Sequence, residues 1–169
     1  MLGTDRGELF LFDNDGKQIW KRSLGIGKLV SMCVSHDEKI AFIGEQSPSG
    51  NLYAIDIAGG DILWKFAAAN VVGAEPAKRS YPSIVHICID QNDNVYANAY
   101  RFVTAKDGSR GYNGKAVAFN KNGDQLWQFP QNENIDSWIN WCDVNDNNGK
   151  VVLSTSAYEI RPDMKYRDT

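Results

Sequence analysis

The chain has 169 residues, of which 43% are hydrophobic and 23% charged, and its formal net charge is −3. This balance is typical of a folded chain with a sizeable core and excludes a disordered one. The mild acidity argues against a general affinity for nucleic acid, which needs a basic face to neutralise phosphates. No apolar run approaches the ~20 residues of a membrane-spanning helix, and the N-terminus lacks the pattern of a signal peptide.

A short motif occurs three times along the chain. The copies read GELFLFDNDGKQIW at 7–20, GNLYAIDIAGGDILW at 50–64 and GKAVAFNKNGDQLW at 114–127. Each starts with a glycine, continues with a stretch that is apolar on both faces, passes through a polar turn and ends on a tryptophan. The repeated positions are Asp13, Gly16, Trp20, Asp56, Gly60, Trp64, Asn120, Gly123 and Trp127.

Each copy of the motif is predicted to form a β-hairpin. A strand that is apolar on both faces is typical of a sheet covered on both sides. The turn glycine supplies the positive φ that a tight antiparallel connection requires. The tryptophan on the returning strand is large enough to cover the edge of a neighbouring unit.

Three further strand pairs are expected between and after these hairpins. They comprise residues 28–34 with 40–45, 83–90 with 95–102, and 138–144 with 151–157. Together with the hairpins they give repeated groups of four short antiparallel strands, which we name A, B, C and D in chain order. Such a group of ~40–50 residues is the size of a β-propeller blade, so the sequence predicts an all-β fold of propeller blades.

The second copy of the motif resembles the PQQ-like repeat of quinoprotein dehydrogenases and related binding propellers. That family's docking motif is Ala-x-Asp-x-x-Thr-Gly-x-x-x-Trp, and residues 54–64 read AIDIAGGDILW, with Gly59 in place of the threonine. The other two copies are one residue shorter in the turn. The resemblance covers nearly the whole chain and favours an extracytoplasmic location. It is shared by enzymes and by non-catalytic propellers, including outer-membrane assembly scaffolds.

The strand groups predict how the chain is divided. A half blade occupies 1–24, whole blades occupy 25–67 and 68–130, and a further half blade occupies 131–169. The sum is about three blade equivalents, whereas closed propellers typically have four to eight. Two explanations are open. The chain is a piece of a longer propeller, or other copies complete the ring by pairing the A–B half of one chain with the C–D half of another.

The long connections are expected on one face of the propeller, where the D–A and B–C segments emerge together. They span 67–82, 99–113, 130–137 and the residues from 159 onward. Long loops on a rigid scaffold often carry function, so this face is the candidate surface for a ligand or protein partner; ordinary loop variation is the alternative. The candidate residues are Glu75, Arg79, Tyr81, Arg101, Lys106, Arg110, Tyr112, Asp136, Trp138 and Trp141.

The cysteines and His86 are interpreted as structural. Cys33 and Cys88 occupy matching positions in successive A strands, and Cys142 is slightly out of register in the third, which indicates packing thiols. The odd number leaves at least one free thiol unless a disulfide joins two chains. His86 lies on strand A near the propeller axis, where a hydrogen-bonded interior role is favoured over a ligand role. No metal site is predicted.

Two functions are weighed. The first is a non-catalytic binding or scaffold propeller that uses its long-loop face. The second is part of a quinoprotein alcohol dehydrogenase, which by resemblance would hold the quinone PQQ and calcium and use a carboxylate base. Enzymes of that family often carry an adjacent Cys-Cys pair against the cofactor, and this sequence has none. The binding propeller is therefore favoured, and no catalytic residue or cofactor is assigned.

Overall fold

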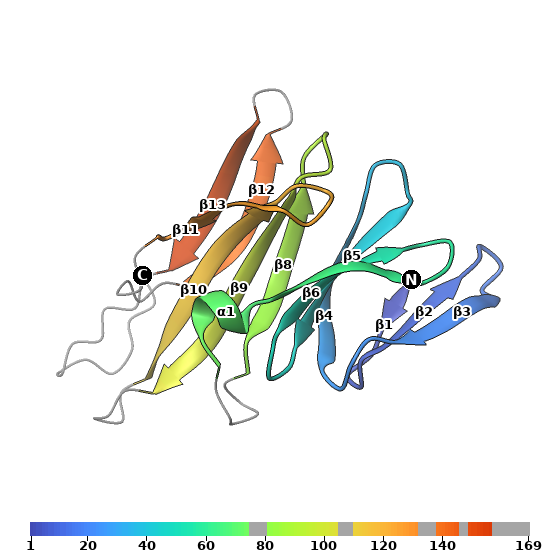
Figure 1. The fold of residues 1–169 in the computed structure, drawn as a ribbon, viewed down its shortest axis with the longest axis horizontal. Coiled ribbons are helices and arrows are strands. Elements are labelled where there is room, and N and C mark those ends of the chain that lie inside the picture. The colour runs from blue at the N-terminus through green and yellow to red at the C-terminus, as the bar shows by residue number, and fades with distance from the viewer. Residues whose placement is uncertain (75–80, 105–109, 132–137, 146–148, 157–169) are drawn as a thin grey trace.

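The computed structural model describes residues 1–74, 81–104, 110–131, 138–145 and 149–156. Within these ranges the chain consists of antiparallel β-strands and a single-turn helix, with the strands arranged in successive stacked sheets (Figure 1). The all-β expectation is confirmed.

The strands form four successive groups, which we call the first to fourth units. The first unit is a sheet in the order β1 (Leu2–Gly3), β2 (Glu8–Phe12) and β3 (Gln18–Ser23). The second unit comprises β4 (Lys28–Val34), β5 (Ile40–Gln46), β6 (Asn51–Asp56) and β7 (Ile62–Ala67). The third unit comprises β8 (Ser83–Ile89), β9 (Val95–Thr104), β10 (Arg110–Phe119) and β11 (Gln125–Phe129). The fourth unit comprises β12 (Trp138–Asn145) and β13 (Lys150–Ser156).

The C–D hairpins of the first three units share the same irregularities. A bulge lies at the same place in each: Leu11/Phe12, Ala54/Ile55 and Ala118/Phe119. The first residue of each turn accepts backbone N–H groups on its side-chain oxygen: Asp13, Asp56 and Asn120. The turn glycines have positive φ, which side chains disfavour: Gly16 +79°, Gly60 +76° and Gly123 +92°. The three hairpins therefore share the same construction, with one more residue in the turn of the second.

The A strands share a second bulge. It lies between Leu29 and Ser31 in β4, between Ile84 and His86 in β8, and between Ile139 and Trp141 in β12. Counted from this bulge, Cys33 and Cys88 occupy the same position, as the sequence predicts, and Cys142 lies one residue earlier.

The core lies between the units, because each sheet packs against the next. The largest cluster joins the second and third units and includes Phe42, Leu52, Ile84, Val117 and Phe119. A second joins the first and second units around Leu9, Trp20, Ile43 and Tyr53. A third joins the third and fourth units around Tyr96, Ala118 and Cys142. Burial on both faces explains why the strands read as continuous apolar runs.

The predicted connection 99–113 is the main departure from expectation. Strand β9 runs to Thr104 and β10 begins at Arg110, so most of the predicted loop is a paired hairpin. Phe102 lies opposite Tyr112, and cross-strand aromatic pairs stabilise antiparallel strands. The glycines and charges in this stretch made the sequence resemble a loop, but the alternating aromatic residues extend the strands.

A short helix, α1 (Ala69–Val72), lies within the predicted connection 67–82. It ends at Gly73, which has a φ of +81°. The sequence interpretation did not anticipate this turn of helix. Among the described residues, no helix is long and apolar enough to cross a lipid bilayer.

Candidate functional site

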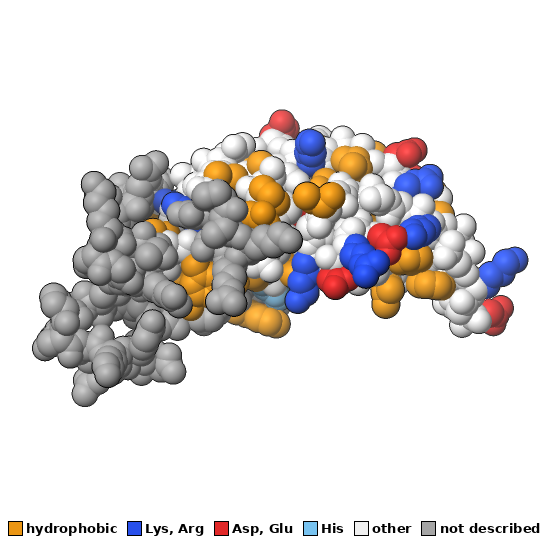
Figure 2. All heavy atoms as spheres, turned by 90° about the horizontal axis from the view of Figure 1, so that it is seen from below, with side chains coloured by type: hydrophobic (Ala, Val, Ile, Leu, Met, Phe, Trp, Pro, Cys, Tyr) orange, Lys and Arg blue, Asp and Glu red, His pale blue; other side chains and the backbone are white. Residues whose placement is uncertain are grey.

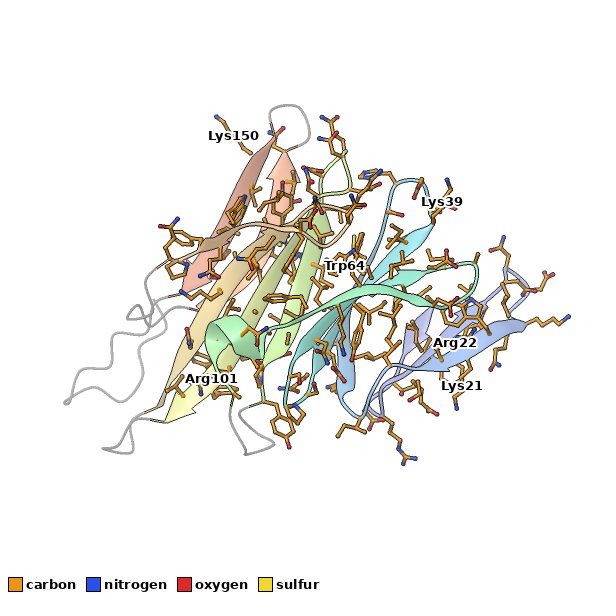
Figure 3. All side chains as sticks on the ribbon, viewed as in Figure 1. Lys21, Arg22, Lys39, Trp64, Arg101 and Lys150 are labelled. Carbon is orange, nitrogen blue, oxygen red and sulfur yellow. The ribbon has the colours of Figure 1, made fainter. Side chains whose placement is uncertain are left out.

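The helix α1 and the β9–β10 hairpin meet at a corner on the long-loop side of the molecule (Figures 1 and 3). Val72 is fully buried there, and its carbonyl oxygen accepts hydrogen bonds from the Arg101 guanidinium and from the Asn113 side-chain amide, the latter at 3.0 Å. Gly73 permits this approach, because a Cβ at that position would come within 2.8 Å of Arg101 Nη2. The D–A and B–C segments are thereby joined into one surface, which we call the α1–hairpin corner.

Three aromatic rings lie on the same hairpin. The centroid of the Phe102 ring is 4.6 Å from that of Tyr112 and 5.8 Å from that of Tyr100. All three residues are half-buried, and burial raises the pKa of the Tyr100 hydroxyl. Figure 2 shows this side of the molecule, where hydrophobic side chains gather between basic and acidic groups. The rings lie on the face of the hairpin opposite Arg101, because Phe102 pairs with Tyr112 and Arg101 with Asn113. Tyrosine and phenylalanine are enriched at protein-binding surfaces.

The ten predicted candidate residues are distributed unevenly. Arg101 and Tyr112 lie at the α1–hairpin corner, and Tyr81 is half-buried two residues before β8. Trp141 lies in the middle of β12 with 58% of its surface exposed. Arg110 and Trp138 begin β10 and β12, and only their backbone is described. Four candidates lie outside the described residues: Glu75, Arg79, Lys106 and Asp136.

His86 lies half-buried between the third and fourth units. Its Nε2 lies 3.0 Å from the carbonyl oxygen of Cys142, and its ring stacks on Trp141 with the centroids 3.9 Å apart. The hydrogen-bonded role that the sequence favours is confirmed, and the ring is half-buried. Within the described ranges, no three His, Cys, Asp or Glu side chains are grouped so that they could hold a metal ion.

Glu45 is a buried carboxylate that the sequence interpretation missed. It is 1% exposed and accepts hydrogen bonds from the Gly27 N–H at 3.2 Å, the Ser47 hydroxyl at 2.9 Å and the Asn51 amide at 2.7 Å. The Tyr53 hydroxyl lies 3.1 Å away, and burial together with the Glu45 charge raises the pKa of Tyr53 to about 12. Through these hydrogen bonds Glu45, in β5, joins the segment before β4 to β6. An acid at the end of the apolar run IAFIGE was the available signal.

Two of the repeat tryptophans are docked on the turn of the following unit. The indole N–H of Trp20 donates to the Ile57 carbonyl at 2.8 Å, and that of Trp64 donates to the Lys121 carbonyl at 2.9 Å. Both acceptors directly follow the first residue of a C–D turn. Each of these tryptophans is therefore hydrogen-bonded to the backbone of the next hairpin.

The turn glycines fit against these tryptophans. A Cβ on Gly60 would lie 3.3 Å from Trp20 Cδ2, and a Cβ on Gly123 would lie 2.7 Å from Trp64 Cγ. A Cβ on Gly16 would meet nothing within 4 Å. The glycine requirement is therefore steric as well as conformational in the second and third units, and conformational alone in the first.

Trp127 differs from the other two tryptophans. It is 36% exposed, and its ring lies 5.8 Å from that of Tyr96 in the same unit. Among the described residues, none accepts a hydrogen bond from its indole N–H, because no C–D turn follows it there. Within the described ranges, the side of the third unit that Trp127 faces is therefore partly exposed.

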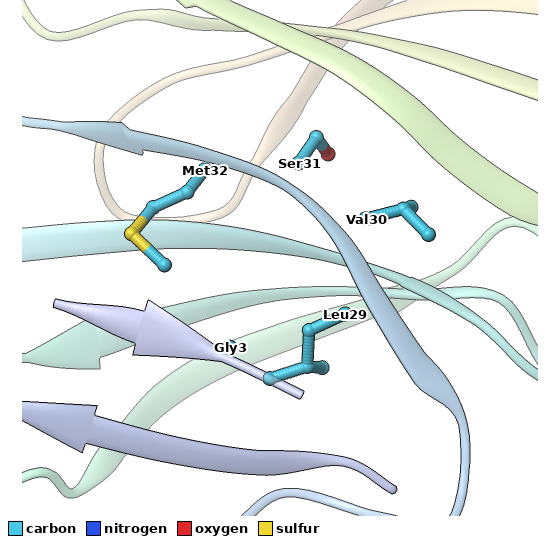
Figure 4. A pocket seen from close by; sticks show the side chains of 5 residues that line it. All are labelled: Gly3, Leu29, Val30, Ser31 and Met32. Atoms are coloured by element: carbon cyan, nitrogen blue, oxygen red, sulfur yellow. The ribbon is translucent and has the colours of Figure 1, made fainter. Parts of the chain in front are cut away.

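A small pocket lies between β1 and β4 (Figure 4). Its volume is about 180 Å³, and it is lined by Gly3, Leu29, Val30, Ser31 and Met32. Ser31 is the polar side chain in this lining, and its hydroxyl already donates to the Ile84 carbonyl at 2.6 Å. With no charged group in the lining, the pocket offers little to orient a ligand.

Comparison with known proteins identifies the repeat. The family model PQQ_2, described as outer membrane protein assembly factor BamB, matches residues 5–138. No curated protein matches the sequence closely enough to count. Among solved structures, the quinohemoprotein alcohol dehydrogenase of Comamonas testosteroni is similar, with a TM-score of 0.55 at 14% sequence identity. The match covers 89% of this chain and 29% of that enzyme, so the likeness is one of fold.

Proposed function

The chain belongs to the PQQ_2 family, whose model is described as outer membrane protein assembly factor BamB, and we propose that it is part of a non-catalytic propeller. In this proposal the long-loop face binds a protein partner, and the protein works in an extracytoplasmic compartment. The observation that carries the proposal is the α1–hairpin corner.

The construction of that corner supports a binding role. Arg101 and Asn113 fix the helix to the hairpin through Val72, so the surface is already ordered before a partner arrives. Preformed surfaces lose less conformational entropy on binding. The half-buried rings of Phe102 and Tyr112 add apolar area on the opposite face of the same hairpin, and aromatic side chains are enriched at the energetic centres of interfaces.

Photo-crosslinking in living cells tests the proposal. A photoreactive phenylalanine analogue is placed at Tyr112, and the matched control carries it at Ile19, which is 56% exposed in the C–D hairpin of the first unit. We expect a discrete protein adduct from position 112 and none from position 19. Adducts from position 19 alone, or from neither position, contradict binding through this face.

A quinoprotein oxidoreductase is the second candidate, because the similar solved structure is an alcohol dehydrogenase. The described residues fit PQQ and calcium poorly. They offer no group of three acidic, His or Cys side chains, and the buried carboxylate Glu45 is occupied by its own donors. Adding PQQ and calcium to the purified chain tests this candidate. A stoichiometric absorbance shift with dye-linked alcohol oxidation would replace the binding proposal.

We also propose that further propeller units complete the ring, from the rest of a longer protein in preference to other copies of this chain. Trp127 supports this, since it has the docking position of Trp64 and no turn in the described part of the chain receives it. The mass of the chain in solution is the measurement. A discrete dimer or trimer that Trp127→Ala dissociates would show that copies of this chain complete the ring instead.

A further inference from the structure

Cys142 lies one residue closer to the A-strand bulge than Cys33 and Cys88 do, and this displacement turns its side chain to the other face of the sheet. Successive side chains of a strand point to opposite faces of the sheet, so a shift of one position reverses the direction of a side chain. Cys33 and Cys88 occupy the same position after the shared bulge, and each points toward the following unit. Cys142 points back toward the third unit, where it packs with Tyr96.

As a result two thiols meet between the third and fourth units. The Sγ atoms of Cys88 and Cys142 are 2.9 Å apart, although 54 positions separate the residues in the sequence. A disulfide bond is about 2.05 Å long, so the sulfurs need to approach by about 0.9 Å. The Cys142 backbone is held in place by His86 Nε2, which lies 3.0 Å from its carbonyl oxygen.

We propose that Cys88 and Cys142 form a disulfide that links β12 of the fourth unit to β8 of the third. The oxidant is a small-molecule disulfide such as oxidised glutathione. Cys88 is the more exposed thiol, whereas Cys142 is 1% exposed, so the oxidant reaches Cys88 first.

The reaction proceeds by two thiol–disulfide exchanges. The Cys88 thiolate attacks a sulfur of oxidised glutathione, which releases one glutathione thiolate and leaves a mixed disulfide. The Cys142 thiolate then attacks the Cys88 sulfur and releases the second glutathione. The protein loses two protons and two electrons, and one oxidised glutathione becomes two reduced molecules.

Cys33 provides an internal control. Cys33 occupies in the second unit the strand position that Cys88 occupies in the third. In the third unit, the residue equivalent to Cys142 is Ile87, and Cys33 packs against the cluster that contains Ile87. Cys33 therefore has no thiol to pair with in this interface. The proposal predicts that the folded chain loses two of its three thiols on oxidation and keeps Cys33 free.

The test is oxidation of the folded chain with oxidised glutathione, followed by thiol counting and peptide mapping by mass spectrometry. We expect one peptide pair joined through Cys88 and Cys142, and a rise of several degrees in the unfolding midpoint, because the link closes a long loop. Cys33→Ser should keep the link, and Cys88→Ser, at a half-buried position, should abolish it.

Several outcomes overturn the proposal. They are three unreacted thiols, a stable glutathione adduct on Cys88 without the internal link, or a link that involves Cys33. Because mapping is done on the unsubstituted chain, a variant that fails to fold does not affect the result. The mapping also stands apart from the binding proposal, since it requires no partner.

Discussion

Trp64 and Trp127 occupy the same place in two successive hairpins, but their surroundings differ. Trp64 lies between Phe42 and Phe119, with ring centroids 5.9 and 5.7 Å away, and donates to a turn of the next unit. Trp127 is 36% exposed and has no such turn among the described residues. The comparison shows that the motif tryptophan needs the turn of the next hairpin as its partner, and that its contribution to the free energy of unfolding depends on that hairpin.

The largest expected effect comes from removing these rings. Trp64→Ala should lower the free energy of unfolding by about 3–5 kcal/mol, because it leaves a cavity between two units and removes the hydrogen bond to the Lys121 carbonyl. Trp127→Ala should lower it by about 1 kcal/mol, since its ring is partly exposed. Urea unfolding of both variants checks the difference. Equal losses would mean that Trp127 is also docked.

The turn glycines give a second matched pair. Both Gly123→Ala and Gly16→Ala force a side chain into positive φ, at about 1–2 kcal/mol each. At Gly123 the new Cβ also lies 2.7 Å from Trp64 Cγ, whereas at Gly16 it meets nothing within 4 Å. We expect Gly123→Ala to be more destabilising by about 1–3 kcal/mol, in line with overpacking elsewhere. Thermal unfolding measures this, and identical losses would argue against the docking of Gly123.

Substitution of Asn98 should stabilise the chain, whereas the substitutions above destabilise it. Asn98 is fully buried on the face toward the fourth unit, and neither polar atom of its side chain has a hydrogen-bond partner among the described residues. Asn98→Ala should therefore raise the free energy of unfolding by about 1 kcal/mol.

The control for this variant lies at the equivalent position of the second unit, which is Gly44. A Cβ there would lie 2.3 Å from the Ile84 carbonyl oxygen, so Gly44→Ala should destabilise the chain. If Asn98→Ala is destabilising as well, the amide has a partner in the fourth unit and that interface is tighter than the described contacts indicate.

A further expected effect is a dependence of stability on alkaline pH. Burial and the Glu45 charge raise the pKa of Tyr53 to about 12, and burial and the Asp90 carboxylate do the same for Tyr96. The folded state thus favours the neutral phenols. Their contribution to stability is complete below the unfolded pKa of about 10 and is lost as the pH rises toward 12.

Tyr53→Phe and Tyr96→Phe should each reduce the slope of stability against alkaline pH without removing it. The quantity to compare is the change in unfolding midpoint between pH 9 and pH 11.5, because the loss of a hydrogen bond shifts the midpoint at every pH. Tyr53 lies at the docked interface between the first two units, and Tyr96 lies beside Trp127. A slope unchanged by both substitutions would contradict the raised pKa values.

Local signals in the sequence were sufficient for most of the strands. Residues 28–34 were predicted as a strand and form β4, and residues 95–102 were predicted where β9 runs from Val95 to Thr104. Such strands combine an apolar run with a turn rich in Asp, Asn and Gly, and both signals lie within a few neighbouring residues. The longer β9–β10 hairpin was missed because its pairing joins residues on either side of a polar stretch.

The candidate site was less accessible from the sequence. The long-loop face followed from topology, but the contact of Arg101 with Val72 depends on a helix that four ordinary residues form only in this packing. Likewise, the matching positions of Cys33 and Cys88 could be read from spacing, whereas the contact of Cys88 with Cys142 depends on how two sheets face each other. The docking of Trp20 and Trp64 on the next unit was signalled by the repeated motif, whereas these other contacts between units carry no local sequence signature.

The docking of each tryptophan on the turn ahead of it gives the molecule a polarity. One side of a unit presents an indole and the other presents a turn, so the two junctions made by Trp20 and Trp64 are heterologous, since each joins two different surfaces. Heterologous contacts generate a closed ring when the rotation between successive units returns to its start, and an open spiral when it does not. The rotation per unit, more than the strength of any single junction, therefore sets how many units such a protein can hold.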